Sequence, residues 1–466
     1  MGDHFDFVVI GSGPAGRRAA VQAAKLGRSV LVIEKDKRVG GVCVHTGTIP
    51  SKTLRETVLN LTGFRERGFY GTGYRARHDI AASDLTERLD KTLGFEVDVL
   101  EHQLTRNRVE TLRGGARLCS PNEIEVVMAA GETRRIHAGK VLIACGTVTR
   151  RPDDVPFDGS IVLDSDELIH IDRLPRSLIV VGAGVIGVEY ATIFSALDVK
   201  VTLIEGRSTF LDFIDREIIE ELVHELRDRG VALRLGSKVE EVAIERGTIE
   251  EGRAVVRLDG GRVVRAEMLL YAAGRTVAAD GLGLEALGIA PDARGRIAVD
   301  EATLQTTVAG IYAAGDAIGF PSLASTSMEQ GRIAACHAFG LKLPPAPKFF
   351  PYGIYAVPEI STVGMTEEQV RAQRIPYECG IARLRETSRG HIMGLRGGMM
   401  KMIFATADGR LLGVHIIGEG ATELVHIGQA VLNLHGTIDY FIENTFNYPT
   451  LAEAYKIAAL DAFNRM

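Results

Sequence analysis

Residues 5–34 have the sequence FDFVVIGSGPAGRRAAVQAAKLGRSVLVIE, and this stretch decides the fold of the N-terminal part of the chain. The apolar run from Phe5 to Ile10 has the length and β-branched content of a strand, and the alanine-rich run from Arg17 to Leu26 has the pattern of a helix. A second buried strand is expected from Ser29 to Ile33. We therefore predict a strand, a glycine turn, a helix and a parallel second strand.

The three glycines of the turn have separate physical roles. Gly11 permits the tight turn, Gly13 lets the backbone approach a pyrophosphate, and Gly16 lets the helix pack closely on the strand. The helix N-terminus attracts the anion, and Glu34 at the end of the second strand can accept hydrogen bonds from the ribose hydroxyls of an adenosine. Glycine spacing alone is weak support, but its position between a strand and a helix, followed by the acid, predicts a dinucleotide site.

The same arrangement occurs a second time in the chain. It consists of a strand from Leu178 to Val181, a helix to about Leu197 and a strand from Lys200 to Ile204, with Gly182, Gly184, Gly187 and Glu205 at the corresponding positions. Two fingerprints predict two dinucleotides, and one site for FAD with one for a nicotinamide nucleotide is the economical explanation. Two more apolar runs support the duplication, because each stops at a small-residue turn that contains Ala144, Gly146 or Gly274.

Composition narrows the class of protein. The chain has 466 residues, of which 46% are hydrophobic and 24% charged, so a globular protein of about two to four domains is expected. The net charge of -6 lacks the basic excess that nucleic acid binding requires. Nucleic acid is therefore not an expected partner.

The five cysteines are scattered and show no metal-ligand spacing, so we expect no metal site and reduced thiols of a cytoplasmic protein. No stretch has the form of a signal peptide, and the longest strongly apolar run is broken by glycines and Glu189. We expect a cytoplasmic enzyme that does not bind a membrane.

The predicted fold class is α/β, with two Rossmann-like dinucleotide-binding domains and a C-terminal α+β interface domain. The insert from Leu54 to Glu110 is expected to be mainly helical, and residues 341–347 form a proline-rich linker. In the last third, strands are predicted at Ile354–Ala356, Lys401–Ala405 and Leu411–Ile417, with a helix at Ala421–Leu434. The expected domains are an FAD domain (1–155 and 276–343), a nicotinamide-nucleotide domain (156–275) and a dimerisation domain (344–466).

Residues 39–52, VGGVCVHTGTIPSK, resemble the active-site segment of the FAD-dependent disulfide reductases. In that family two cysteines five positions apart form a redox disulfide over the flavin. The first is Cys43 here, but the second position is Thr48, so no disulfide can form between these two sites. Cys43 could still attack a substrate by itself; a packed thiol near the isoalloxazine is the favoured interpretation.

The resemblance also assigns residues to the flavin and the nucleotides. It implies that Lys52 lies near flavin N5 and pairs with Glu189, both catalytic, and that Asp316 in the run 311–316 accepts a hydrogen bond from the ribityl chain. A helix that begins near Ser322–Ser325 would direct its N-terminal dipole at the flavin. The cofactor and nucleotide contacts are expected from Gly11, Gly13, Gly16, Glu34, Lys35, Gly41, Cys43, Thr48, Lys52, Ala144, Gly146, Gly182, Gly184, Gly187, Glu205, Arg207, Gly274, Asp316 and Ala324.

The C-terminal run 446–453 carries a second departure from the disulfide reductases. The family has a histidine before Pro449, which exchanges protons with the dithiol across a dimer; this chain has Tyr448, although Glu453 remains. A phenol with an ordinary pKa near 10 cannot replace an imidazole at neutral pH. Two substitutions that disable one half-reaction indicate that thiol chemistry has been abandoned.

Over nearly its whole length the chain is similar to the soluble pyridine nucleotide transhydrogenases. That resemblance implies FAD, both NAD(H) and NADP(H) as substrates, ping-pong hydride transfer in one nicotinamide site, and oligomers built on dimers. Glu205 suits a free 2′-hydroxyl and Arg207 can offer a cation to a 2′-phosphate, so both nucleotides are expected to bind, with NAD(H) favoured. Two other functions stay open: a relative of dihydrolipoamide dehydrogenase that reduces a quinone or another acceptor, and a retired flavoprotein that serves as a binding module.

Overall fold

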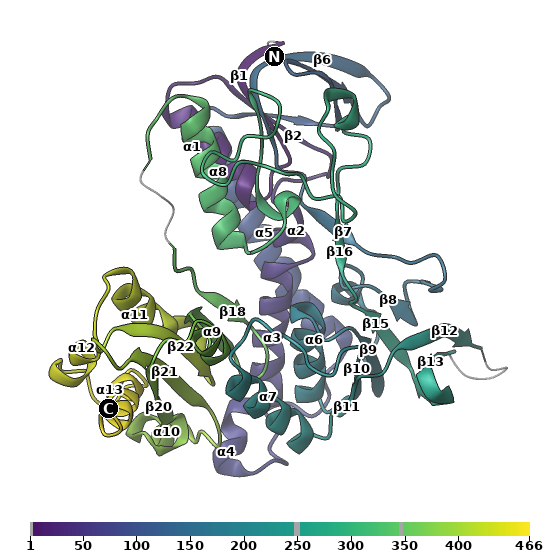
Figure 1. Cartoon of the computed structure of the whole chain (residues 1–466). Helices are drawn as coiled ribbons and strands as arrows, with labels where there is room; N and C mark the ends of the chain where they lie inside the picture. Colours follow the sequence, from purple (N-terminus) through teal and green to yellow (C-terminus); the bar gives the residue numbers. More distant parts are fainter. Residues whose placement is uncertain (1–2, 247–251, 344–347) are drawn as a thin grey trace. The chain divides into compact units, whose positions relative to one another are not determined.

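The computed structural model describes residues 3–246, 252–343 and 348–466 (Figure 1). The chain forms two compact units, each built from separated segments. The first unit comprises Met1–Thr53, Glu87–Arg150 and Gly274–Ala346, and the second comprises Leu54–Thr86, Arg151–Ala273 and Pro347–Met466. The predicted linker lies partly outside the described residues, at 344–347, and the four finer domain ranges stay a prediction.

A seven-stranded sheet forms the centre of the first unit, in the order β3-β2-β1-β6-β5-β4, with β17 paired to β6. Strands β3, β2, β1, β6 and β17 pair in parallel with one another, whereas β5 pairs antiparallel with both β6 and β4. The strands are β1 (His4–Ile10), β2 (Val30–Glu34), β3 (Glu110–Arg113), β4 (Gly115–Ser120), β5 (Glu123–Val127), β6 (Thr133–Ile143) and β17 (Ile311–Ala313). The predicted strand–turn–helix–strand unit is confirmed as β1, α1 (Pro14–Lys25) and β2.

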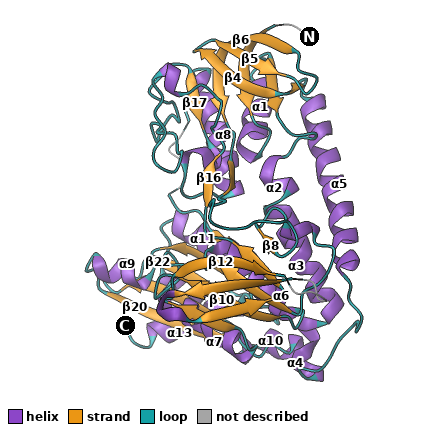
Figure 2. Ribbon diagram, turned by 90° about the vertical axis from the view of Figure 1, so that its right-hand side faces the viewer, coloured by secondary structure: helices purple, strands orange, loops and turns teal. Residues whose placement is uncertain are grey.

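Both faces of this sheet are covered, which explains the nearly continuous apolar strands. Phe7 and Val9 pack with α1, α5 (Ala82–Arg106) and α8 (Ala324–Ala338), while Val8 and Ile10 pack into the opposite core. Helices α1 and α8 lie side by side (Figure 2), because Gly331 leaves room for the backbone oxygen of Ala15. A two-stranded ladder of β7 (Thr147–Thr149) and β16 (Arg275–Val277) completes the unit.

The predicted helical insert is confirmed as α3 (Thr48–Thr62), α4 (Arg67–Tyr70) and α5. Leu85, Leu89, Val97 and Leu100 of α5 are buried, as their spacing predicted, and the structure shows Leu93 half-buried.

The second unit contains a five-stranded parallel sheet in the order β11-β10-β9-β15-β8. The second predicted repeat is confirmed as β9, α6 and β10, and the helix α7 follows it. The antiparallel sheet β12-β13-β14 was not predicted, and its strands are partly exposed. The elements are β8 (Val162–Leu163), β9 (Ser177–Val181), α6 (Val185–Ala196), β10 (Lys200–Glu205), α7 (Arg216–Asp228), β11 (Ala232–Leu235), β12 (Val239–Glu245), β13 (Arg253–Leu258), β14 (Val263–Ala266) and β15 (Met268–Tyr271).

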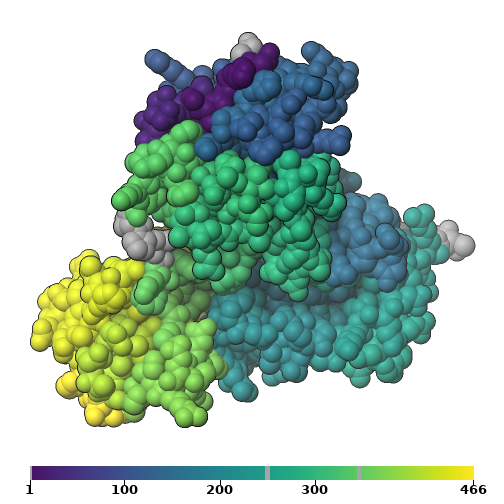
Figure 3. Space-filling view, turned by 45° about the horizontal axis from the view of Figure 1, so that its top comes forward, coloured from purple at the N-terminus to yellow at the C-terminus, as the bar shows by residue number. Residues whose placement is uncertain are grey.

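An antiparallel sheet in the order β18-β19-β22-β21-β20 organises the C-terminal part of the same unit, drawn in light green and yellow in Figure 3. The predicted strand at 354–356 is wrong in its bounds, because β18 ends at Ile354 and residues 355–359 connect it to β19. Strands β19 and β20 were not predicted. The elements are β18 (Tyr352–Ile354), β19 (Ile360–Gly364), α9 (Glu367–Ala372), β20 (Tyr377–Arg383), α10 (Ser388–Met393), β21 (Met399–Ala405), β22 (Leu411–Ile417), α11 (Ala421–Asn433), α12 (Ile438–Glu443) and α13 (Glu453–Phe463).

The expected fold class is therefore confirmed: α/β, with two parallel-sheet nucleotide folds and a C-terminal α+β part. Among the described residues, no helix combines the length and the apolar character that a membrane span requires.

Candidate active site

The first glycine turn has the geometry that a phosphate cradle needs. Gly11 has a φ of 101°, and a Cβ there would stand 2.3 Å from the backbone oxygen of Ala144. A Cβ on Gly16 would stand 1.9 Å from the backbone oxygen of Gly11, so only glycine fits at either position. A Cβ on Gly13 would meet no described atom within 4 Å, which leaves its face open to a ligand.

The second turn repeats this geometry residue by residue. Gly182 has a φ of 99°, and a Cβ there would stand 2.8 Å from the backbone oxygen of Ala272. A Cβ on Gly187 would stand 1.9 Å from the oxygen of Gly182, and a Cβ on Gly184 would meet nothing within 4 Å. The two turns therefore present the same open backbone surface.

Each turn is followed by a helix whose first turn has free donors. Gly13 and Gly184 are the N-caps of α1 and α6, and neither helix has a side-chain cap or an acidic residue in its first turn. The first backbone N–H groups of a helix have no intrahelical acceptor, so they can bind a pyrophosphate. The residues present thus fit a dinucleotide at both turns.

Two acids stand at equivalent positions beyond these helices. A carboxyl oxygen of Glu34 accepts a hydrogen bond from the backbone N–H of Ser12 at 2.9 Å, and the other accepts from Asp36 N–H at 3.0 Å. Glu205 likewise accepts from the N–H of Ala183 at 3.0 Å and of Arg207 at 3.1 Å. These bonds fix each carboxylate beside its turn, where a ribose would lie. The Ser12 hydroxyl, which the sequence did not single out, binds both Glu34 and the N–H of Gly40.

The remaining predicted residues of the first turn also surround it. Gly41 has a φ of 61° and its Cβ position lies 3.0 Å from Gly13 Cα. Ala144 and Gly146 follow β6, and Gly146 has a φ of 66°. Lys35 is exposed directly after Glu34.

Cys43 and Thr48, the two positions of the family's redox cysteines, lie on consecutive helices, α2 (Gly41–His45) and α3. Cys43 is on α2 and is a free thiol, and its side chain forms a hydrogen bond with Thr48, the first residue of α3. Burial raises the pKa of the Cys43 thiol above its ordinary value of 9.0, and the bond to Thr48 and the charges of Arg17 and Lys52 oppose this only in part. The thiol is therefore protonated at neutral pH.

Lys52 is one helical turn beyond Thr48 on α3, so the two side chains lie on the same face of the helix. Its Nζ donates to the hydroxyl of Ser51 at 3.3 Å. Glu189 on α6 is 3% exposed and accepts a hydrogen bond from the backbone N–H of Tyr355 at 2.9 Å. Lys52 belongs to the first unit and Glu189 to the second, and their pairing stays a prediction.

Asp316 lies at the end of β17, in the 3-10 turn Gly315–Ile318. Burial raises the pKa of its carboxyl, while the charge of Arg275 and a hydrogen bond from Thr147 act in the opposite direction. Arg275 in turn donates from Nε to the Thr147 hydroxyl at 2.9 Å. Thr147 and Arg275 were not predicted as site residues, because their contact depends on the pairing of β7 with β16. Ala324 is the first residue of α8, as the expected helix start near Ser322–Ser325 requires, and Gly274 precedes Arg275 with a φ of 116°.

Arg207 lies next to the acid of the second repeat. Its Nε is 3.1 Å from Glu205 Oε1, and its Nη1 is 2.9 Å from Asp212 Oδ2. Burial alone would raise the pKa of Glu205, but hydrogen bonds from Arg207 and Ala183 outweigh it and hold that pKa below its usual range. Glu205 is therefore ionised at neutral pH.

Tyr448, at the position of the family's histidine, is 67% exposed, and its Oη lies 2.6 Å from the hydroxyl of Ser388. Glu453 begins α13, and its Oε2 is buried with no hydrogen-bond partner in the described part of the chain. Across the same described residues, no cluster of histidine, cysteine, aspartate and glutamate could hold a metal ion.

Comparison with known proteins agrees with this geometry. The family described as pyridine nucleotide-disulphide oxidoreductase matches residues 5–331, and its dimerisation domain matches residues 350–459. The soluble pyridine nucleotide transhydrogenase of Mycobacterium tuberculosis is 49% identical over 463 residues, which cover 99% of this chain and 98% of the relative. The protein of the same name from Yersinia enterocolitica is 40% identical over 467 residues, 99% of both chains.

Two solved structures are similar over almost the whole chain. LpdA from Mycobacterium tuberculosis is 28% identical with a TM-score of 0.88, covering 97% of this chain and 99% of that one. The HOCl-induced flavoprotein disulfide reductase RclA from Escherichia coli is 28% identical with a TM-score of 0.86, covering 98% of this chain and 99% of that one.

Proposed function

Because the chain belongs to the pyridine nucleotide-disulphide oxidoreductase family, we propose that it transfers hydride between NADPH and NAD+, in either direction, through bound FAD and without a redox disulfide. The observation that carries the proposal is the pair Cys43 and Thr48: a hydroxyl occupies the position of the second sulfur, beside two complete nucleotide turns. The chain thus retains what hydride transfer needs and lacks what dithiol chemistry needs.

The first unit is the proposed FAD site. The open backbone at Gly13 and the N-terminus of α1 would hold the pyrophosphate, Glu34 the adenosine ribose, and Asp316 the ribityl chain. FAD, when bound, supplies a two-electron carrier that accepts hydride from one nicotinamide and returns it to another.

The second unit is the proposed nicotinamide-nucleotide site. Gly184 and the N-terminus of α6 would bind the pyrophosphate, and Glu205 the adenosine ribose. Since the chain has one such turn besides the FAD turn among its described residues, donor and acceptor would occupy it in succession. Ping-pong exchange follows from one site used twice.

Lys52 and Glu189 are the proposed catalytic pair. An ammonium near flavin N5 would stabilise negative charge there, and a carboxylate would hold the ammonium in place. Glu189 is suited to this because a backbone N–H already fixes one of its oxygens and the side chain is almost fully buried.

Cys43 has no proposed chemical role. A thiol whose pKa is raised by burial is protonated at neutral pH and is therefore a poor nucleophile. Its contact with Thr48 makes it a packing group at the start of α3.

The proposed assembly is a homodimer or a higher homo-oligomer. Its support is the match of residues 350–459 to the family's dimerisation domain.

The test is turnover of NADPH with thio-NAD by purified holoenzyme, followed at the absorbance of reduced thio-NAD, for wild type and Cys43→Ala. We expect turnover in both proteins at rates within about twofold, because the thiol takes no part. Loss of activity in Cys43→Ala, with flavin content unchanged, would restore a thiol mechanism. Turnover with a quinone but none with thio-NAD would instead support an electron-acceptor reductase.

A further inference from the structure

The guanidinium of Arg207 is held between two carboxylates. It donates from Nε to Glu205 and from Nη1 to Asp212, and Nη2 lies 3.4 Å from the other Glu205 oxygen. These are the same donors that a bidentate contact to a phosphate would use. The arginine that could bind a 2′-phosphate is therefore engaged by the protein itself.

Asp212 is held in position for this contact. The Thr209 hydroxyl donates to Asp212 Oδ1 at 2.7 Å, so the carboxylate has one oxygen for Thr209 and one for Arg207. Its neighbours Phe210, Leu211 and Ile214 are 2%, 3% and 3% exposed, so the loop between β10 and α7 is anchored by apolar burial. Asp212 thus projects outward from a fixed loop.

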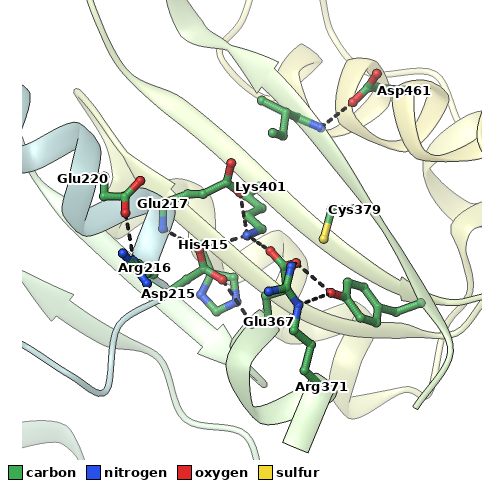
Figure 4. A network of polar contacts seen from close by, with 12 residues as sticks. Asp215, Arg216, Glu217, Glu220, Glu367, Arg371, Cys379, Lys401, His415 and Asp461 are labelled. Carbon is green, nitrogen blue, oxygen red and sulfur yellow. Dashed lines mark hydrogen bonds and ion pairs between the residues drawn. The ribbon is translucent and has the colours of Figure 1, made fainter. Parts of the chain in front are cut away.

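The far end of that loop is fixed by a buried ionic cluster around Lys401 (Figure 4). Asp215 caps α7 by accepting from the N–H of Glu217, and its other oxygen accepts from the N–H of Glu367 at the start of α9. Lys401 Nζ is 3.1 Å from Asp215 and 2.6 Å from Glu217, and it also pairs with Glu367. A loop tied at this end cannot carry Asp212 far from Arg207.

The two nucleotides make different demands on this group of charges. A free 2′-hydroxyl needs only an acceptor such as Glu205, whereas a 2′-phosphate brings about two negative charges and needs the arginine. Asp212 opposes the phosphate twice, because it occupies Nη1 and adds a like charge. Lys238 also lies beside this loop, because its Cγ is 3.7 Å from the Cβ position of Gly206, and its backbone N–H donates to the carboxylate of Asp259 at 3.0 Å. Arg207 thus faces two carboxylates, Glu205 and Asp212, and loss of the Asp212 charge would leave it with one.

We propose that Asp212 sets the preference between NAD(H) and NADP(H) by holding Arg207 away from the 2′-phosphate of the nucleotide. Asp212 is then a positioning residue that acts through Arg207 and does not itself contact the free 2′-hydroxyl. The inference rests on the proposed function, because it assigns the nucleotide selectivity of that same site.

The test measures Kd of the oxidised holoenzyme for NADP+ and for NAD+ by calorimetry, in wild type, Asp212→Asn and Thr209→Val. Asp212→Asn should raise the NADP+ to NAD+ affinity ratio about threefold to tenfold, which is the range expected for releasing an exposed ion pair and removing a like charge. Thr209→Val should move the ratio in the same direction by less, because it only loosens Asp212. The exposed pair Arg216–Glu220 on α7 provides the control, since Glu220→Gln also removes one carboxylate beside an arginine.

An unchanged ratio in Asp212→Asn, or an equal shift in Glu220→Gln, would overturn the inference while wild-type binding of both nucleotides upheld the proposed function. Wild-type holoenzyme that bound neither nucleotide would overturn the proposed function and the inference together.

Discussion

At the scale of single residues, Thr48 defines how this chain differs from a disulfide reductase. Its hydroxyl contacts the Cys43 thiol, so the spacing of the motif is retained while the second redox sulfur is absent. All five cysteines are free, and burial raises the pKa of Cys145 to about 11 and of Cys379 to about 12. We therefore propose that electrons pass between nicotinamide and flavin without a dithiol.

Restoring the second sulfur should restore the bridge. In Thr48→Cys the new thiol would lie within contact of Cys43, and a disulfide should form on oxidation because the two side chains already meet. Dithiothreitol should then release about two more titratable thiols per chain than the oxidised variant shows, whereas reduction should leave the wild-type count unchanged. An identical count before and after reduction of the variant would mean that the α2–α3 geometry differs from that described.

The sequence was enough to recognise the substituted residues of these motifs, but not to predict which residues contact one another. Thr48 and Tyr448 could be recognised because each replaces a known side chain inside a specific motif. Asp212, Thr147 and Arg275 carried no signal, because each acts through a loop or strand pairing that residue spacing does not encode.

At the scale of elements, the two glycine turns, at residues 11–16 and 182–187, have the same backbone geometry. In both, the first glycine has a positive φ and lies against a backbone oxygen, that of Ala144 or Ala272, and the third glycine lies against the first. Only the middle glycine has a free face. The space around each Cβ position therefore distinguishes the first and third glycines, which the turn itself requires, from the middle glycine, which is free to contact a ligand.

This separation predicts opposite outcomes for two glycine substitutions. Gly184→Ala should fold and retain flavin but raise the Kd of nicotinamide nucleotides about tenfold or more, since its methyl would enter the phosphate space. Gly187→Ala should lose soluble folded protein, since its methyl would collide with the backbone of Gly182. Gly94→Ala in the interior of α5 is the matched control, because its methyl meets no described atom and should stabilise the helix by up to about 1 kcal/mol. Unaltered nucleotide affinity in Gly184→Ala, measured by calorimetry on the holoenzyme, would place the pyrophosphate elsewhere.

Strands with a clear apolar pattern in the sequence were predicted correctly, and strands without one were not predicted. The nearly continuous apolar runs of β1, β2, β9 and β10 indicate parallel strands that are buried on both faces of a sheet. The strands β12, β13 and β14 are partly exposed and rich in charge, so their pairing depends on antiparallel partners that a local pattern does not reveal.

At the scale of the whole molecule, separated segments assemble into each unit, and buried polar contacts join them. In the second unit the Lys401 cluster links α7, which follows the second glycine-turn repeat, with α9 and β21 of the C-terminal part (Figure 4). Lys401 is 1% exposed, and on β21 it points away from the apolar face that contains Met400 and Met402. Sequence periodicity assigns such a position to the core, and only the three partners explain a lysine there.

Removing the cluster's cation should loosen the second unit. Lys401→Met leaves the buried Asp215 without its cation and leaves Glu367 with only Arg371, a change that costs about 3–5 kcal/mol of unfolding free energy for a buried pair. Lys91→Met, which removes one exposed helical pair with Glu87, should cost no more than about 0.5 kcal/mol. Calorimetric melting of the two variants beside wild type checks the difference; equal transition temperatures would show that the cluster does not join these parts.

The difference in unfolding free energy between wild type and Lys401→Met should also depend on pH. Burial alone would raise the pKa of Glu367, but hydrogen bonds from Lys401 and Tyr377 lower it from 4.5 to about 2. A depressed carboxyl pKa contributes stability above its unfolded value and loses it as pH falls toward the folded value. The difference between wild type and Lys401→Met should therefore be constant near neutral pH and shrink between pH 4.5 and about 2. A difference that grew over that interval would contradict the assignment.

Hydride exchange without a disulfide is tested most directly by anaerobic titration of the purified holoenzyme with NADPH, followed at the flavin absorbance, and then by addition of NAD+. We expect complete bleaching with about one NADPH for each flavin, and return of the absorbance with formation of NADH when NAD+ is added. A requirement for a second equivalent of NADPH, or a flavin that stays bleached in the presence of NAD+, would contradict the account.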